Sequence, residues 1–455
     1  MAPPAMQSPG ELNGGATPHV LFIPSAGIGH LTPVFRVIAG FSSQGIDVSV
    51  VTVLPTVSAA ESAYFDGLFA DYPVVRRVDM HLLPLDAAEF ATTEDPFFLR
   101  WEALRRSVHQ LGPIVAGAAP RVTAIITDIT LTSCVVPIAR ELSVPCHVLF
   151  PTAATMLALN AHYPIYLDQL EGGPVGDVDV PGVFRVPRSS LPPALLDVNK
   201  LFTKQADGVL VNTFDYVEPA PLAALRGGKI VPGYPPVYTI GPLKPHTAAT
   251  KAGTGDGLLD EWLGRQPARS VRGAARPDPG NRRRAGGHGY PFLWVLKTTK
   301  VDREDTAEPA DVLGGGFLER VRGRGLVTKG WVEQEALLKH PAVGMFLSHG
   351  GWNSALEASS DGVPVLVWPQ LDDHRLNAMA AVGAGIGEWA EDWGWDGDDR
   401  LVTGEEIAAK VKEVMADEKL RASVAVAREE AARAVAEGGT SYRNIHEFIA
   451  KLKGA

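Results

Sequence analysis

Residues 331–374 combine side chains suited to stacking on a base, binding phosphate and bonding sugar hydroxyls. An apolar run at 343–347 predicts a buried strand, the tight turn SHGG follows at 348–351, and 352–360 predicts a helix that ends near 361–362. The two glycines let backbone approach a ligand closely, and the first turn of a helix offers unpaired N–H groups and a positive dipole end. The sequence therefore predicts a phosphate site where this helix begins.

Polar and aromatic residues around the turn extend the predicted site to an activated sugar nucleotide. Asn353 and Ser354 lie in the first helical turn, and Glu357 follows one turn later, where its carboxylate can accept from ribose hydroxyls. Trp331 offers a flat ring for stacking, and the run DDH at 372–374 offers groups that bond sugar hydroxyls. Taken singly, these residues are also typical of a core tryptophan, a helix cap and a solvated pair of acids. Their concentration in one unit favours the sugar-nucleotide interpretation.

A histidine and an aspartate near the start of the chain could supply acid–base chemistry. His30 follows the run SAGIG at 25–29, and Asp128 ends the apolar run 122–127, so both are expected where parallel strands end. A histidine there can take a proton from a phenol near neutral pH, and a carboxylate on its other ring nitrogen fixes the tautomer. The competing interpretation is a structural histidine or a helix cap.

The segment 331–374 resembles the signature of the family 1 glycosyltransferases of plants, which use uridine diphosphate sugars. The resemblance implies a UDP-sugar cosubstrate, no cofactor and no metal. It also implies roles for nine residues, which contact uracil (Trp331), ribose (Gln334, Glu357), the diphosphate (His349, Asn353, Ser354) and the sugar (Trp352, Asp373, His374). Glu333 replaces the usual small residue or proline. His374 stands where glucose-using members usually carry glutamine, so galactose is an alternative to glucose as the donor sugar.

The same resemblance implies that His30 and Asp128 are a catalytic dyad for direct, inverting displacement at the anomeric carbon. Backbone N–H groups at the helix start, together with His349, would stabilise the leaving phosphate in place of a metal ion. The residues Asp177 and Asp179 also match a metal-binding DxD of another glycosyltransferase fold, but their surroundings in a Gly, Pro and Asp loop disfavour that interpretation.

The first half of the chain is similar to plant C-glycosyltransferases that act on 2-hydroxyflavanones and related phenols, in runs such as IPSAGIGHLTP, EDPFFLRWEALRRS and TDITLTS. The pair Asp128-Ile129 matches a motif associated with C-transfer rather than O-transfer. A flavonoid O-glycosyltransferase remains the alternative. Four residues are candidates for an apolar acceptor cleft or, equally, for ordinary core: Phe97, Phe98, Trp101 and Met156. A fifth candidate, Arg100, could orient an acidic phenol or simply be solvated.

Length and alternating strand and helix signals predict an α/β protein with two doubly wound Rossmann-like domains, and the resemblance implies that they face each other in the GT-B arrangement. The expected organisation is a flexible tail (1–18), an acceptor domain (19–240), a linker (241–257), a UDP-sugar domain (258–436) and a C-terminal helix that packs back on the first domain (437–455). We expect a monomer.

Bulk properties exclude several classes of protein. A net charge of −10 and a pI of about 5.7 disfavour a nucleic-acid partner. Cys134 and Cys146, both in apolar strand-like runs, suggest reduced thiols and a cytoplasmic location rather than a disulfide framework. No apolar run reaches the length of a membrane span.

Residues 270–290, SVRGAARPDPGNRRRAGGHGY, interrupt the resemblance, because the family has the apolar first strand of its second domain there. Arginine, proline and glycine cannot form a buried strand of the usual kind, so the second domain is expected to be damaged at 272–290. A shifted reading frame or a misjudged splice site would produce such a passage. The alternative to an active enzyme is therefore a non-catalytic pseudoenzyme that lacks this strand.

Overall fold

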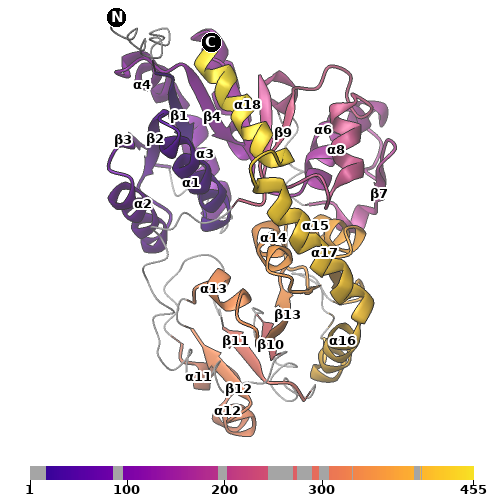
Figure 1. The fold of residues 1–455 in the computed structure, drawn as a ribbon. Helices are drawn as coiled ribbons and strands as arrows, with labels where there is room; N and C mark the ends of the chain where they lie inside the picture. Colours follow the sequence, from indigo (N-terminus) through magenta and orange to yellow (C-terminus); the bar gives the residue numbers. More distant parts are fainter. Residues whose placement is uncertain are drawn as a thin grey trace, which may run out of the picture.

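A computed structural model of the chain describes residues 17–85, 96–192, 202–243, 270–273, 289–296, 307–329, 332–393, 400 and 402–454. It contains two α/β lobes, each built on a parallel sheet with helices over its faces (Figure 1). This architecture confirms the predicted fold class. None of the described helices combines the length and the apolar character needed to cross a membrane. The expected linker lies largely outside the described residues.

The first sheet has seven strands in the order β3-β2-β1-β4-β5-β8-β9. All its neighbouring strands are parallel, and its central strands are buried throughout, as a sheet covered on both faces requires. The strands are β1 (His19–Ile23), β2 (Asp47–Leu54), β3 (Arg76–His81), β4 (Ala124–Asp128), β5 (Cys146–Phe150), β8 (Gly208–Val211) and β9 (Val237–Thr239). A separate antiparallel hairpin joins β6 (Val178–Val180) to β7 (Phe184–Val186).

The second sheet has six parallel strands in the order β12-β11-β10-β13-β14-β15. They are β10 (Ser270–Gly273), β11 (Phe292–Val295), β12 (Gly325–Thr328), β13 (Val343–Ser348), β14 (Val365–Val367) and β15 (Gly387–Trp389). The expectation that no strand fills the first position of this domain is wrong. Four residues, SVRG, form β10 between β11 and β13, because backbone pairing with two neighbours requires no particular side chain. Residues 274–288 lie outside the described part of the chain.

Helices cover both sheets and connect their strands. In the first lobe they are α1 (Ile28–Ser43), α2 (Ala59–Asp71), α3 (Pro96–Ser107), α4 (Leu111–Gly117), α5 (Thr132–Glu141), α6 (Ala154–Gln169) and α8 (Pro219–Arg226). In the second they are α11 (Pro309–Leu313), α12 (Gly315–Val321), α13 (Gln334–Leu338), α14 (Trp352–Ser360), α15 (His374–Gly383), α16 (Gly404–Ala416) and α17 (Glu418–Val435). Cys134 lies in α5 rather than in a strand, while Cys146 begins β5, and both thiols are buried and free.

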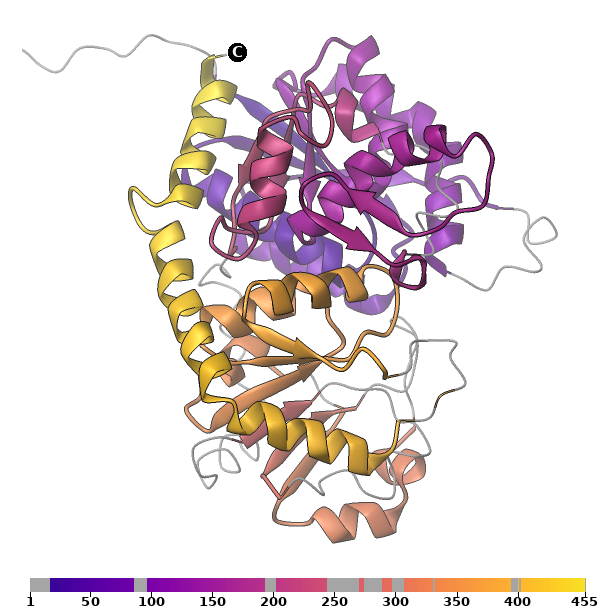
Figure 2. The same cartoon turned by 90° about the vertical axis from the view of Figure 1, so that its right-hand side faces the viewer.

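The last helix, α18 (Thr440–Gly454), returns along the side of the molecule to the first lobe (Figures 1 and 2). Phe448 and Ile449 are adjacent, Leu452 lies about one helical turn further on, and all three are buried in the apolar cluster behind β1 and β9. The Ser441 hydroxyl donates to the Gly241 carbonyl, 2.5 Å away. The helix therefore ties the end of the chain to the first sheet.

Candidate active site

Each sheet has one point where its strand order reverses, and the chemically capable residues gather at these two points. In the first lobe the chain builds β1, β2 and β3 outward and then returns to place β4 beside β1. In the second it builds β10, β11 and β12 outward and returns to place β13 beside β10. Such reversals leave a crevice at the carboxyl ends of the strands, where open α/β sheets bind ligands.

His30 and Asp128 meet at the reversal in the first lobe. Asp128 is the last residue of β4, and His30 lies in the first turn of α1, which follows β1 after a tight turn at Gly27 (φ 93°). The His30 Nδ1 lies 2.8 Å from the Asp128 Oδ2. The carboxylate is fully buried, whereas the imidazole keeps 36% of its surface exposed. The pair thus has the geometry of a base with its orienting carboxylate.

The surroundings favour ionisation of Asp128 and basicity of His30. Burial opposes the charged imidazolium, but the charge and hydrogen bond of Asp128 outweigh it, so the pKa of His30 is raised. Burial likewise opposes the Asp128 carboxylate, but His30 and two hydrogen bonds from Thr130, at 2.9 and 2.7 Å, keep the pKa of Asp128 lowered. Because Nδ1 is bound to Asp128, Nε2 is the ring nitrogen available to a substrate.

The turn before α14 is closed tightly around Gly350. The backbone of Gly350 has φ 98°, and a Cβ there would lie 2.9 Å from the Val367 Cγ1 and 3.1 Å from the His374 carbonyl oxygen. Only glycine fits such a turn without strain. Its carbonyl accepts from the Asn377 amide at 3.0 Å. The expected strand, turn and helix are therefore all present, since the tight turn connects the end of β13 to the N-terminus of α14.

The N-terminus of α14 touches the first lobe beside His30. The Asn353 Nδ2 donates to the carbonyl of Gly29, the residue before His30, at 2.9 Å. The buried Asn212, which follows β8, donates to the Asn353 Oδ1 at 2.7 Å and accepts from the Trp352 indole at 2.9 Å through its backbone carbonyl. Sequence reasoning missed Asn212, because only the fold brings it to α14. The candidate phosphate site and the candidate base thus face each other.

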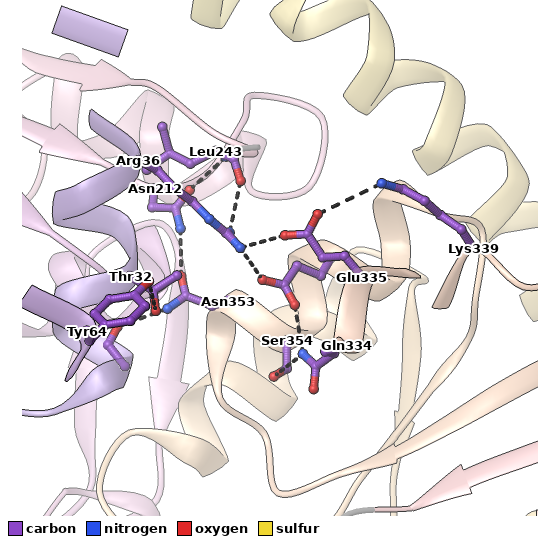
Figure 3. Close-up of polar contacts among 12 residues, drawn as sticks. Thr32, Arg36, Tyr64, Asn212, Leu243, Gln334, Glu335, Lys339, Asn353 and Ser354 are labelled. Carbon is purple, nitrogen blue, oxygen red and sulfur yellow. Dashed lines mark hydrogen bonds and ion pairs between the residues drawn. The ribbon is translucent and has the colours of Figure 1, made fainter. Parts of the chain in front are cut away.

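The two residues expected at the ribose contact each other. The Gln334 Nε2 donates to the Glu357 Oε2 at 2.7 Å and lies 3.0 Å from the Ser354 Oγ. The other Glu357 oxygen accepts from Arg36 of the first lobe at 2.8 Å. No local sequence feature marks Arg36, whose side chain points toward Glu335 (Figure 3). Trp331, the expected uracil-stacking residue, lies outside the described residues.

Two of the three residues expected at the sugar, Asp373 and His374, lie at the start of α15, whereas Trp352 is buried at the start of α14. The Asp373 carboxylate accepts from the Thr152 hydroxyl of the first lobe. The His374 ring stands edge-on to that of His349, with centroids 4.8 Å apart. Burial lowers the pKa of His374 to about 4, so this imidazole is neutral at pH 7. Its Nδ1 accepts from the Leu371 N–H at 3.2 Å, which leaves Nε2–H as a donor.

The candidate acceptor residues do not form one group. The Arg100 side chain is only 10% exposed rather than solvated, and its guanidinium donates to the carbonyls of Val53 and Pro55 at the end of β2. Trp101 packs against the apolar cluster behind β1 and β2, and Met156 is buried in a different cluster. The side chains of Phe97 and Phe98, on α3, lie outside the described part of the chain.

The alternative metal motif is engaged in other contacts. The Asp177 carboxylate accepts from Arg185 at 3.1 Å and from the Arg188 N–H at 2.9 Å. Among the described residues, no group of three or more His, Cys, Asp or Glu is arranged so that it could hold a metal ion.

Comparisons with known proteins agree with this geometry. The family model described as UDP-glucoronosyl and UDP-glucosyl transferase matches residues 304–425. A rice protein (Oryza sativa subsp. indica) named UDP-glycosyltransferase CGT is 50% identical over 99% of both chains. UDP-glycosyltransferase 708A6 of Zea mays is 47% identical over 97% of this chain and 99% of its own. The crystal structure of LpCGTa in complex with UDP superposes with a TM-score of 0.81 at 39% identity, covering 96% of this chain and 99% of that one. The chain therefore belongs to the UDP-glycosyltransferase family, and it is a UDP-sugar-dependent hexosyltransferase with the GT-B fold.

Proposed function

We propose that the chain transfers glucose from UDP-glucose to a ring carbon of a phloroglucinol-type phenol such as a 2-hydroxyflavanone, with inversion at the anomeric carbon. The observation that carries the proposal is the hydrogen bond from Asn353 to Gly29, because it sets the first turn of α14 directly against the residue that precedes His30. A diphosphate on α14 and a phenol at His30 would therefore be neighbours across one crevice.

Each residue of the crevice has a role in this reaction. His30 Nε2 takes the phenol proton, and Asp128 stabilises the resulting imidazolium. Loss of that proton makes the ortho carbon electron-rich, so that carbon attacks the anomeric carbon as the bond to the diphosphate breaks. The ring carbon then loses its own proton and regains aromaticity. The N–H groups at the start of α14, with His349, stabilise the negative charge on the departing UDP.

Transfer to carbon rather than oxygen is supported by relatives rather than by geometry alone. The similar rice protein and LpCGTa both carry CGT in their names. Since the same base serves an attacking oxygen or carbon, the atom that faces the sugar decides the product. We propose glucose rather than galactose as the donor sugar, because the matching family model is described as UDP-glucoronosyl and UDP-glucosyl transferase. The neutral His374 offers the sugar only a hydrogen-bond donor, where an amide would offer both a donor and an acceptor.

The earlier alternative of an inactive product depended on the loss of the first strand of the second sheet. Because β10 fills that position and pairs with both neighbours, this reason no longer holds. Incubation with UDP-glucose or UDP-galactose and a 2-hydroxyflavanone tests the proposal by mass spectrometry and acid hydrolysis. We expect a hexose adduct that survives acid. Sugar released by acid would establish O-transfer, and the absence of any adduct with either donor would overturn the proposal.

A further inference from the structure

Arg36 reaches from the first lobe into the predicted ribose site (Figure 3). Its Nη1 donates to the Leu243 carbonyl at 3.0 Å, and its Nη2 donates to Glu335 at 2.6 Å and to Glu357 at 2.8 Å. The arginine and Glu357 side chains are each only 12% exposed. One buried guanidinium thus holds two carboxylates that belong to the other lobe.

We propose that Arg36 is a positioning residue for the donor, which holds the Glu357 carboxylate in the orientation that meets the ribose hydroxyls. This inference rests on the proposed function of the crevice as a UDP-sugar site. It adds a residue of α1 to the donor site, which is otherwise expected to be built from the second lobe.

The hydrogen-bonding capacity of Glu357 fits a ribose diol. An ionised carboxylate can accept about four hydrogen bonds. Arg36 occupies one position on Oε1 and Gln334 occupies one on Oε2. With respect to the part of the chain that the structure describes, two positions remain, one on each oxygen, and a ribose offers two neighbouring hydroxyl donors. Arg36 and Gln334 therefore set the orientation of the carboxylate and leave room for both hydroxyls.

Without Arg36, two mostly buried carboxylates would lie close together, with the exposed Lys339 ammonium 3.9 Å from Glu335. Glu335 and Glu357 bind the same nitrogen of Arg36, so they are near neighbours. Burial raises the pKa of Glu335 to about 7 even with Arg36 present. Removal of the guanidinium would leave the two acids to repel each other, so that Glu357 turns away from its present orientation. A turned Glu357 would no longer offer both oxygens to the ribose hydroxyls and would no longer distinguish a ribose from its deoxy form.

Arg36 also links the donor site to the base. It lies on the same helix as His30, six residues and about 9 Å further along the axis. A helix held at Arg36 by the second lobe keeps His30 at a fixed place relative to the nucleotide. This link gives the two lobes one defined arrangement at the crevice.

The test compares binding of UDP and of 2′,3′-dideoxy-UDP by titration calorimetry. Arg36→Met should weaken UDP binding about 10- to 100-fold and change the affinity for the dideoxy nucleotide less than about threefold. The preference for the ribose hydroxyls therefore disappears. Arg226→Met is the matched control, because Arg226 pairs with Asp215 within the first lobe at 3.0 Å, and it should keep the wild-type preference.

Equal weakening of both nucleotides by Arg36→Met, or unchanged affinity for both, would overturn the inference. If Arg36→Met does not fold, Arg36→Lys decides: a single ammonium lacks the planar fork of arginine, so the preference should still fall, and an unchanged preference would again overturn it. Failure of wild-type protein to bind UDP would instead count against the proposed function.

Discussion

Replacement of Gly350 by alanine tests whether the turn before α14 is as constrained as the structure shows. The backbone there has φ 98°, a conformation that costs a residue with a Cβ about 1 to 3 kcal/mol. The added methyl would also lie 2.9 Å from the Val367 Cγ1 and 3.1 Å from the His374 carbonyl oxygen. Overpacking of this kind typically costs another 1 to 3 kcal/mol.

The combined loss of unfolding free energy should be about 2 to 6 kcal/mol, provided that the turn keeps its shape. For a lobe of ordinary domain size, this corresponds to a fall in Tm of roughly 4 to 24 °C. If the turn yields instead, the backbone N–H groups move away from the phosphate site, and UDP binding should weaken by a comparable free energy.

Thermal unfolding and UDP titration on the same sample measure both effects. Gly383→Ala is the matched control, because Gly383 lies in α15 of the same lobe and a Cβ there meets nothing within 4 Å. Alanine should keep or raise the stability at that helical position. A Gly350→Ala protein with the Tm and the UDP affinity of the control would refute the account of the turn.

Three further predictions follow from the same site. Asp128→Asn should lower kcat about 100- to 10,000-fold and shift the acidic limb of the kcat/KM profile to lower pH, because the pKa of His30 is no longer raised; an unshifted limb would argue against the dyad. The wild type should lose at most about 3 kcal/mol of unfolding free energy as pH rises from 4.5 through about 7, because the folded-state pKa of Glu335 is raised to about 7. Glu335→Gln should abolish this loss. The sign follows because a carboxyl with a raised folded-state pKa costs free energy once it ionises; parallel urea-unfolding profiles of both proteins against pH would contradict this. His374→Gln should shift donor preference toward glucose, measured as the ratio of rates with UDP-glucose and UDP-galactose; an unchanged ratio would show that this position does not contact the sugar.

Local chemistry allowed much of the site to be predicted from the sequence. The strand at 343–348, its turn and the helix at 352–360 formed where the apolar run and the glycines indicated. His30 and Asp128 were placed together because parallel strands expose their carboxyl ends on one edge of a sheet. These features depend on short-range pattern and on one topological rule.

Contacts between distant segments could not be predicted. Arg36 and Asn212 have no local feature that marks them, and they became part of the site only because the lobes bring α1, β8 and α14 together. The strand β10 was missed for a different reason. Its composition argued against a buried strand, but a parallel sheet is held by backbone hydrogen bonds, which four residues between two neighbours can make.

Arg100 shows the limit of assigning roles by residue type. A charged side chain beside aromatic residues suggested an acceptor contact or a solvated surface. In the structure, the Arg100 guanidinium donates to carbonyls at the end of β2, and its Nη2 lies 3.9 Å from the Oε1 of the buried Glu61. Only the position of the neighbouring strand end determines this role.

The most direct test of the central claim is a parallel measurement of turnover and UDP affinity for His30→Ala. If His30 is the base of a UDP-sugar transferase, turnover of a phenolic acceptor should fall by at least about 100-fold, while the Kd for UDP stays within about threefold of the wild type. Turnover close to that of the wild type, with UDP still bound, would contradict the assignment of the base.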